Sequence, residues 1–146
     1  MLFRSRVNNE GSGPTVHSIP GNVDKVWRVL PAAFDSLGIP VTRIDPALKV
    51  IGNQGLKIRQ HLKRVPLSRY LDCGTTQIGP NADSYEVFLV LLVQLKPAPG
   101  APESSQVITT FEASARPLTF SQGYSKCTTS TALEKRLLDA ISAQLK

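Results

Sequence analysis

The sequence predicts a single α+β domain, in which an antiparallel sheet packs against an N-terminal amphipathic helix and grips a long C-terminal helix. Amphipathic helix patterns lie near both ends of the chain, and segments with strand patterning follow one another between them. Strands without an intervening helix pair as antiparallel hairpins, and both helices then bury their apolar stripes on the sheet. The 146 residues, 41% hydrophobic and 19% charged, suit one core.

The first 14 residues are set apart from this domain. Met1–Ser5 contains Leu-Phe-Arg-Ser, one reading-frame translation of a common sequencing adapter, and Val7–Pro14 has the composition of a linker. We interpret the start as an adapter artefact on a truncated environmental gene fragment; the alternative is a genuine frayed N-terminus. Under the first interpretation the absence of a signal peptide says nothing about the compartment. The folded domain is expected over residues 15–146.

A short strand over Thr15–Ile19 and a helix over Val23–Leu37 open the domain. Asn22 is a suitable N-cap, and Gly38 supplies a left-handed C-cap. Apolar residues recur every three or four positions of the helix and form one stripe. The stripe consists of Val23, Val26, Trp27, Leu30, Phe34 and Leu37.

The next part of the chain predicts short strands. Val41–Asp45 and Lys49–Asn53 flank a turn, and Ser68–Cys73 is a further strand. The segment Gln54–Arg64 fits a strand with basic residues on one face, or a helix with a weak apolar stripe. Both interpretations of that segment stay open from the sequence.

Two long strands are predicted over Ser84–Lys96 and Ser105–Arg116. The centre of the first, Val87–Val93, is apolar on both faces, which is typical of a central strand covered on both sides. Three prolines within Lys96–Pro102 predict a hairpin loop, because proline cannot donate to a sheet ladder. Pro117–Lys126 is expected to be a loop or an irregular edge.

The C-terminal helix begins after Thr131, which stands three residues before Glu134 in the spacing of a capping box. An apolar stripe along this helix predicts the face that it buries on the sheet. The stripe consists of Leu133, Leu137, Leu138, Ile141 and Leu145.

The chain has two cysteines, Cys73 and Cys127. With His17 and His61 they provide no close pair of metal ligands, and a catalytic thiol has only His61 nearby in the sequence as a base. The remaining alternatives are a disulfide bond and two separate buried thiols. We favour the disulfide, because the two cysteines lie near the two flanks of the predicted sheet and suit a single bridge from the last helix to the strands. Such a bond implies an oxidising compartment.

Catalytic and cofactor motifs are missing from the sequence. There is no glycine-rich dinucleotide or phosphate loop and no serine nucleophile elbow, and the acidic residues are dispersed. We predict no enzyme activity, no metal and no cofactor. The longest apolar run, Val87–Val93, is far shorter than the roughly 20 residues that span a bilayer.

Basic residues are concentrated in residues 49–69, a stretch without acidic residues. If Gln54–Arg64 is a strand, Lys57, Arg59 and Lys63 share one face and form a ribbon suited to phosphates or anionic lipid headgroups. A solvated face or a charge-protected edge is the simpler interpretation, because aromatic residues are not interleaved. The net charge of +6 permits an anionic surface as partner, whereas nucleic acid is not expected.

Three short phrases carry a family resemblance. Ile19–Trp27, followed by Leu37–Ile39, resembles the helix opening of the C component of the bacterial outer-membrane barrel-assembly machine, a lipoprotein. Leu71–Gly74 and Cys127–Ser130 are similar to segments of uncharacterised envelope proteins of environmental bacteria. The resemblance implies a helix-grip fold and a periplasmic or outer-membrane-anchored location, and it transfers no catalytic residue.

These observations predict a non-enzymatic, extracytoplasmic and envelope-associated interaction domain whose partner is a protein or another envelope component. The alternative function is binding of a small apolar ligand between the sheet and the C-terminal helix. The residues that would line this cavity are Phe88, Val90, Leu92, Ala113, Leu137 and Ile141. Direct packing of the helix on the sheet is the simpler interpretation of the same residues.

Overall fold

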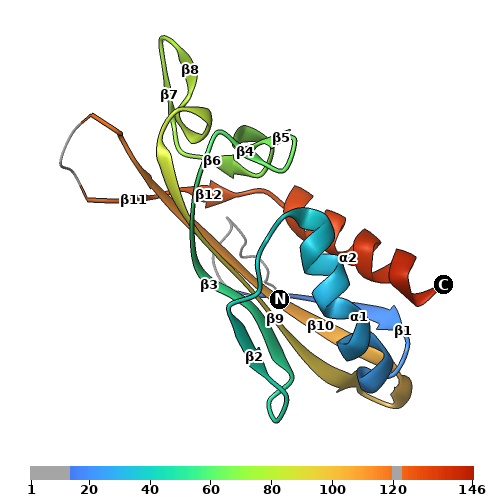
Figure 1. Ribbon diagram of the computed structural model, residues 1–146. Helices are drawn as coiled ribbons and strands as arrows, with labels where there is room; N and C mark the ends of the chain where they lie inside the picture. Colours follow the sequence, from blue (N-terminus) through green and yellow to red (C-terminus); the bar gives the residue numbers. More distant parts are fainter. Residues whose placement is uncertain (1–13, 120–122) are drawn as a thin grey trace, which may run out of the picture.

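A computed structural model describes residues 14–119 and 123–146 of the chain. The expected adapter-derived start and nearly all of the expected linker lie outside the described residues. An antiparallel sheet forms one layer, and helices α1 (Val23–Leu37) and α2 (Ala132–Leu145) lie side by side on one of its faces (Figure 1). The predicted α+β class, with an N-terminal and a C-terminal helix, is confirmed.

The main sheet has the strand order β1-β10-β9-β3-β2, and all neighbouring strands in it are antiparallel. A short strand, β11, pairs with the far end of β10. The six strands are β1 (Thr15–Pro20), β2 (Arg43–Asp45), β3 (Val50–Arg59), β9 (Glu86–Ala98), β10 (Ala101–Arg116) and β11 (Ser125–Lys126).

Between β3 and β9 the chain leaves the sheet and forms short hairpins and 3-10 turns. The paired strands are β4 (His61–Leu62) with β5 (Val65–Pro66), β6 (Leu71–Asp72) with β12 (Thr128–Thr129), and β7 (Thr75–Thr76) with β8 (Gly79–Pro80). The 3-10 turns are Leu67–Arg69 and Asn81–Asp83. The strand expected over Ser68–Cys73 is therefore wrong, because the 3-10 turn takes its first residues and leaves only Leu71 and Asp72 paired.

Helix α1 begins and ends at the predicted residues. The Asn22 side chain accepts a hydrogen bond from the backbone N–H of Lys25 at 2.9 Å, which satisfies one free donor of the first turn. Gly38 has a φ of 81° and donates its backbone N–H to the carbonyl of Asp35. Glycine takes this left-handed conformation without strain, so the helix ends there.

Helix α2 begins as predicted, but its capping box does not form. Thr131 makes no side-chain cap bond, and the Ser130 hydroxyl lies 3.3 Å from the backbone nitrogen of Ala132. Glu134 is buried and accepts a hydrogen bond from the Thr15 hydroxyl of β1. The Glu134 carboxylate thus ties the last helix to the first strand, and this long-range partner takes the place of the local cap.

The two long strands are joined more tightly than predicted. β9 continues to Ala98 and β10 starts at Ala101, and these two residues face each other across a turn at Pro99 and Gly100. The loop expected over Lys96–Pro102 is therefore wrong. The register shifts after Ala101, so the ladder is irregular where the prolines lie, and this irregularity accommodates them.

Buried and half-buried residues alternate along β9 and β10, so each strand turns one face toward the helices. The inward residues join α1 and α2 in one core. They are Val87, Leu89, Leu91, Val93 and Leu95 of β9 and Val107, Thr109, Phe111, Ala113 and Ala115 of β10. The helix residues of this core include Val26, Leu30 and Phe34 of α1 and Leu133, Leu137 and Ile141 of α2.

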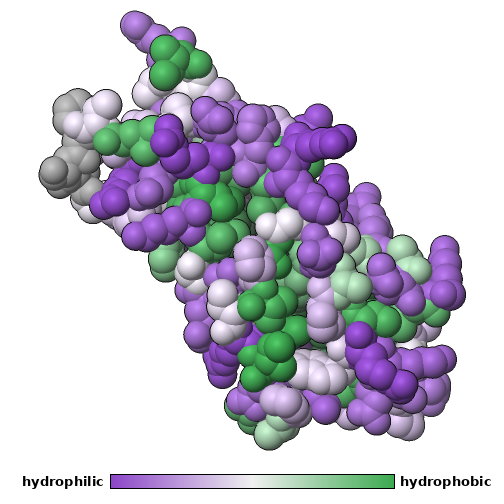
Figure 2. Space-filling view, viewed as in Figure 1, coloured by the Kyte–Doolittle hydropathy of each residue, from purple (hydrophilic) through white to green (hydrophobic). Residues whose placement is uncertain are grey.

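The opposite face of the sheet, here called the open face, has no helix or second sheet over it within the described residues (Figure 1). Its half-buried residues include Phe88, Val90, Leu92 and Gln94 of β9 and Gln106, Ile108, Thr110 and Ser114 of β10. The expectation that Val87–Val93 is covered on both sides is wrong, because both helices pack on the same side. From the side seen in Figure 2, hydrophobic patches run through the middle of the molecule between hydrophilic residues.

A bulge between Asn53 and Leu56 shifts the register of β3 against β9. Gly52 has a φ of 155°, and a Cβ there would lie 2.1 Å from the carbonyl oxygen of Leu91, so only glycine allows this close approach. Asn53 is buried and donates its side-chain amide to the carbonyl of Pro40 at 2.8 Å. The bulge sets which residues of the second half of β3 lie on the open face.

Candidate functional site

One row of side chains crosses the open face. The strand register places Lys57 of β3 beside Phe88 of β9, Phe88 beside Ser114 of β10, and Ser114 beside Lys126 of β11. Phe88 and Ser114 are half-buried, and the two lysines at the ends of the row are exposed. Because neighbouring strands lie about 4.8 Å apart, three spacings separate the lysine Cα atoms by about 14 Å. The row therefore has an uncharged middle, formed by Phe88 and Ser114, between two cations.

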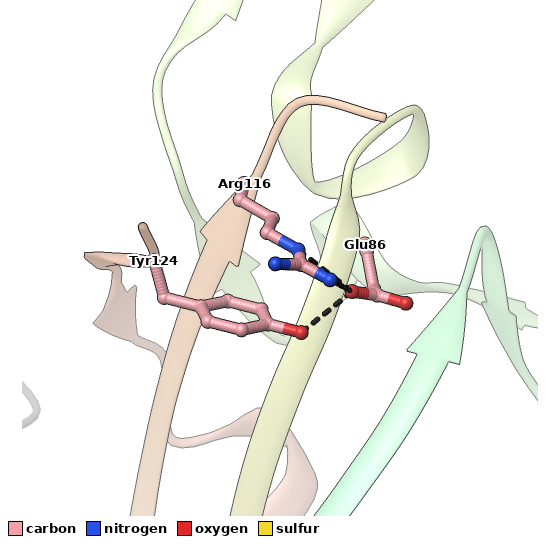
Figure 3. Close-up of polar contacts among 3 residues, drawn as sticks. All are labelled: Glu86, Arg116 and Tyr124. Carbon is pink, nitrogen blue, oxygen red and sulfur yellow. Dashed lines mark hydrogen bonds and ion pairs between the residues drawn. The ribbon is translucent and has the colours of Figure 1, made fainter. Parts of the chain in front are cut away.

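Beside this row, Glu86, Arg116 and Tyr124 form a hydrogen-bonded cluster (Figure 3). The Arg116 guanidinium lies 2.9 Å from Oε1 of Glu86, and the Tyr124 hydroxyl donates to the same oxygen at 2.6 Å. The guanidinium carbon lies 4.8 Å from the centre of the Tyr124 ring, which is 5.8 Å from the ring of Phe88. The cluster thus borders Phe88, the apolar residue in the middle of the row.

The cluster favours the ordinary charge states of Glu86 and Tyr124. The hydrogen bond from Tyr124 lowers the pKa of the Glu86 carboxyl below its ordinary value of 4.5, and Arg116 lowers it further, while desolvation opposes both. The same hydrogen bond raises the pKa of the Tyr124 hydroxyl above 10.0. Glu86 is therefore ionised and Tyr124 neutral across the neutral pH range.

A hollow of about 300 Å³ opens on the open face beside the cluster. Such a volume lies at the lower end of the range for small-molecule sites and suits one or two inserted side chains. The lining residues are Phe88, Val90, Glu112, Ala113, Ser114 and Lys126. An apolar floor with one carboxylate and one ammonium at its rim fits an amphipathic partner.

A second hollow, of about 330 Å³, lies at the opposite end of the two helices, between the β1–α1 turn and the end of α2. It is lined by Pro20, Gly21, Lys25, Ser142, Leu145 and Lys146. Its large apolar side chain is Leu145, and the titratable side chains among its lining residues are those of Lys25 and Lys146.

The predicted basic ribbon forms only in part. The first half of Gln54–Arg64 is strand, and Lys57 and Arg59 both project from the open face of β3. Gln60 then adopts a φ of 69° and ends the strand, and Lys63 lies in the β4–β5 turn with a φ of 55°. A ribbon of three cations along one strand is therefore wrong, because the chain turns out of the sheet before Lys63.

The residues predicted to line one apolar cavity lie at two different places. Phe88 and Val90 line the hollow on the open face, where Leu92 lies as well, and Ala113 borders this hollow although it is an inward residue of the core. On the other side of the sheet, the side chains of Leu137 and Ile141 are completely buried in the core. Successive residues of a strand point to opposite faces, so these residues cannot surround one ligand.

The predicted cysteine pairing brings the two sulfurs to the distance of a disulfide bond, with 2.08 Å between Sγ of Cys73 and Sγ of Cys127. Cys73 follows β6 and Cys127 precedes β12, so the bond reinforces the β6–β12 pair. The backbone N–H of Cys127 also donates to the carbonyl of Ala113 at 2.9 Å. The linkage thus fixes the segment before α2 to both the hairpin region and the sheet.

In the part of the chain that the structure describes, no three His, Cys, Asp or Glu side chains form a group suited to a metal ion. No helix among these residues is long and apolar enough to cross a membrane. His17 and His61 are both exposed, on β1 and β4.

Sequence reasoning does not identify Arg116, Tyr124 or Lys126 as members of a site. Tyr124 and Lys126 fall in the segment expected to be a loop or an irregular edge, where no periodicity indicates their orientation. Arg116 lies opposite Glu86 only because the register of the two long strands shifts between Ala101 and Ser105. The tight turn alone, with Ala98 opposite Ala101, would place Glu86 opposite Ala113, so the sequence offers no direct signal for Arg116.

Comparisons with models of known protein families and with curated proteins find no match for this chain. The functional conclusion therefore comes from the chemistry of the open face, where an apolar floor, a hollow, an ion pair and exposed lysines lie together.

Proposed function

We propose that the protein is a non-enzymatic, extracytoplasmic domain that binds a protein or another envelope component through the open face of its sheet. The open face carries this proposal, because the helices cover one side of the sheet and leave Phe88, Val90 and Leu92 half-exposed on the other. Contiguous apolar side chains of this kind gain free energy when a partner removes them from water. The hollow and the charges around it add the shape and polarity that a specific contact needs.

The proposed location is the periplasm or the outer membrane, as part of an envelope-associated protein. The sulfur-to-sulfur distance of Cys73 and Cys127 supports this location, because disulfide bonds persist in oxidising compartments and are rare in reducing ones. We also propose that the fold belongs to the helix-grip group, which the arrangement of an antiparallel sheet against a C-terminal helix supports.

The alternative function, an apolar ligand held between the sheet and α2, has less support. Leu137 and Ile141 are completely buried and share one core with the inward residues of the sheet. Direct packing of this kind leaves the helix–sheet layer filled by the protein's own side chains.

Photo-crosslinking from the open face tests the proposed function. The photoreactive residue p-benzoylphenylalanine replaces Val90 in one variant and the exposed Lys135 of α2 in the control, and both proteins are exported to the periplasm of a diderm bacterium. We expect a discrete adduct from position 90, at least about tenfold more abundant than from position 135, since binding energy concentrates where apolar area is buried. No adduct from position 90, or equal adducts from both, would contradict the proposal.

The oxidation state of the cysteines tests the location in the same cells. We expect the exported protein to show no free thiols to an alkylating reagent before reduction and two after reduction of the denatured protein. Two freely alkylated thiols in the exported protein would remove the support for an oxidising compartment.

A further inference from the structure

We propose that the partner of the open face is an acidic amphipathic helix, which lies along β9 and β10 with its carboxylates on Lys57 and Lys126. This inference rests on the proposed function and names the chemistry of the partner. Three features carry it: the spacing of the two lysines, the floor between them, and the charge of the whole face.

The spacing of the two lysines matches the width of a helix. Lys57 and Lys126 lie at the two ends of one row, three strand spacings and about 14 Å apart. A helix with its side chains is about 10–12 Å wide, so one helix lies between the two lysines with an acidic side chain reaching out on each flank. A helix that lies along the strands therefore has one lysine on each side, at the same position along its axis.

The floor between the lysines accepts an apolar stripe. Phe88, Val90 and Leu92 follow one another at alternate positions of β9 and all point to the open face. The hollow of about 300 Å³ beside Phe88 and Val90 accepts one or two apolar side chains of the partner. Tyr124, held by Glu86 and packed on Phe88, stands at one end of this floor and limits how far a helix extends.

The charge of the open face selects an anionic partner. The strand register places six basic and three acidic side chains there. They are Arg43, Lys57, Arg59, Lys96, Arg116 and Lys126 against Asp45, Glu86 and Glu112. One of the three carboxylates, that of Glu86, already bonds Arg116 and Tyr124. Two copies of this face would repel each other, whereas an acidic partner is attracted and oriented.

The exposed Glu112 limits where the expected partner can carry acidic residues. It lines the hollow next to Lys126, in the strand position that pairs with Val90. A carboxylate of the partner directly above Glu112 would be repelled, so the partner carries a neutral or basic residue at that point. The acidic residues of the helix are thus confined to its two flanks.

The test uses labelled peptides of about 18 residues, long enough to hold a helix, with one leucine stripe and glutamates on both flanks. The matched peptide carries lysines in place of the glutamates. Binding to the whole oxidised protein is followed by fluorescence anisotropy at about 50 mM and about 300 mM salt. We expect the acidic peptide to bind at least about tenfold more tightly than the basic one, and the difference to shrink at the higher salt concentration.

Charge reversal locates the binding site. We expect the double variant Lys57→Glu, Lys126→Glu to raise the Kd of the acidic peptide at least about tenfold. The control Lys25→Glu, Lys135→Glu makes the same change in net charge on exposed positions of the two helices, and its Kd should stay within about twofold. Circular dichroism and the oxidised cysteine pair check that each variant folds, and the milder pair Lys57→Gln, Lys126→Gln replaces any variant that does not.

Three results would overturn the inference: equal binding of both peptides, an equal loss in both double variants, or no loss in either. Sedimentation with anionic phosphatidylglycerol vesicles tests whether the negatively charged partner is a lipid surface. Vesicle binding that depends on Lys57 and Lys126, without preference for the acidic peptide, would assign the face to a lipid surface instead. A crosslink from position 90 without any preference for acidic peptides would leave the proposed function intact and reject only this partner.

Discussion

The centre of strand β9 is apolar on both faces of the sheet, and the two faces differ in what covers them. Leu91 of β9 points toward the helices and is completely buried, whereas Leu92, the next residue, points to the open face and is half-exposed. Two leucines at adjacent positions thus differ in their surroundings, since Leu91 lies in the core and Leu92 lies on the open face. The helix side holds the fold together, and the open side has apolar area left to bind with.

This difference shows that the composition of a strand does not reveal its surroundings. A strand that is apolar on both faces is expected in the centre of a three-layer protein. Here the sheet and the helices form two layers, and the described residues place no third layer over the second apolar face of β9. Substitutions of matched residues on the two faces separate the energetics of folding from those of binding.

The largest expected effect comes from truncating the two adjacent leucines of β9. We expect Leu91→Ala to lower the free energy of unfolding by about 2–5 kcal/mol, because it leaves a cavity in the core. Leu92→Ala should cost about 1 kcal/mol or less, since water fills the space. Urea unfolding followed by the fluorescence of Trp27 measures both. An equal cost at the two positions would show that the open face is part of a folded core.

The next effect is removal of the cysteine linkage, which anchors the segment leading into α2. We expect Cys73→Ser, Cys127→Ser to lower the free energy of unfolding by about 2–4 kcal/mol, because the bond restricts a long loop of the unfolded chain. Unfolding with and without reductant checks this, and the double variant should be insensitive to reductant. Unchanged stability on reduction of the wild-type protein would contradict the expectation.

A smaller contrast is expected between two threonines on opposite faces. Thr15→Val removes the hydroxyl that donates to buried Glu134, so we expect a loss of about 1–3 kcal/mol from the unpaired carboxylate. Thr110→Val on the open face should change stability by about 0.5 kcal/mol or less. Thermal unfolding of the two variants at neutral pH compares them. A neutral Thr15→Val would mean that this hydrogen bond contributes nothing to closing the fold.

The smallest effect is the pH dependence of the cluster on the open face. The pKa of Glu86 is lowered in the folded state, so its contribution is present above the ordinary value of 4.5 and is lost as pH falls through the lowered value. The pKa of Tyr124 is raised, so its contribution is present below pH 10.0 and is lost as pH rises through the raised value. We expect the melting temperature of Glu86→Gln to fall less below pH 4.5 than that of the wild type. Parallel melting curves against pH would contradict this assignment.

Local signals in the sequence account for most of the helices and long strands. Asn22 and Gly38 mark the two ends of α1, and both ends are where these residues predict them. The capping-box spacing of Thr131 and Glu134 is equally clear but does not form, because Glu134 binds Thr15 at the other end of the chain. Sequence patterns that reflect contacts between neighbouring residues predict both ends of α1. The capping-box pattern fails because a distant residue, Thr15, takes the place of Thr131 as the partner of Glu134.

The candidate site was less predictable for the same reason. Lys57 and Arg59 are recognisable as basic residues of one strand face, but the bulge in β3 and the turn at Gln60 decide which cations stay there. Lys126 lies on the open face only because β11 pairs with the end of β10. This contact involves two residue pairs, and no periodic pattern in the sequence predicts it. Register, which sets every row of the site, is a property of the assembled sheet.

The hydrogen bond between Thr15 and Glu134 joins positions 119 residues apart and bears on the order in which the domain is completed. A polypeptide leaves a ribosome or a translocation channel from its N-terminus, so β1 emerges long before α2 exists to receive it. The hairpin of β9 and β10 can form before α2 has been synthesised, because its two strands are adjacent in the sequence. The contact between β1 and α2 therefore forms only after Glu134 has been synthesised, and truncating the chain before Glu134 should leave Thr15 without this partner.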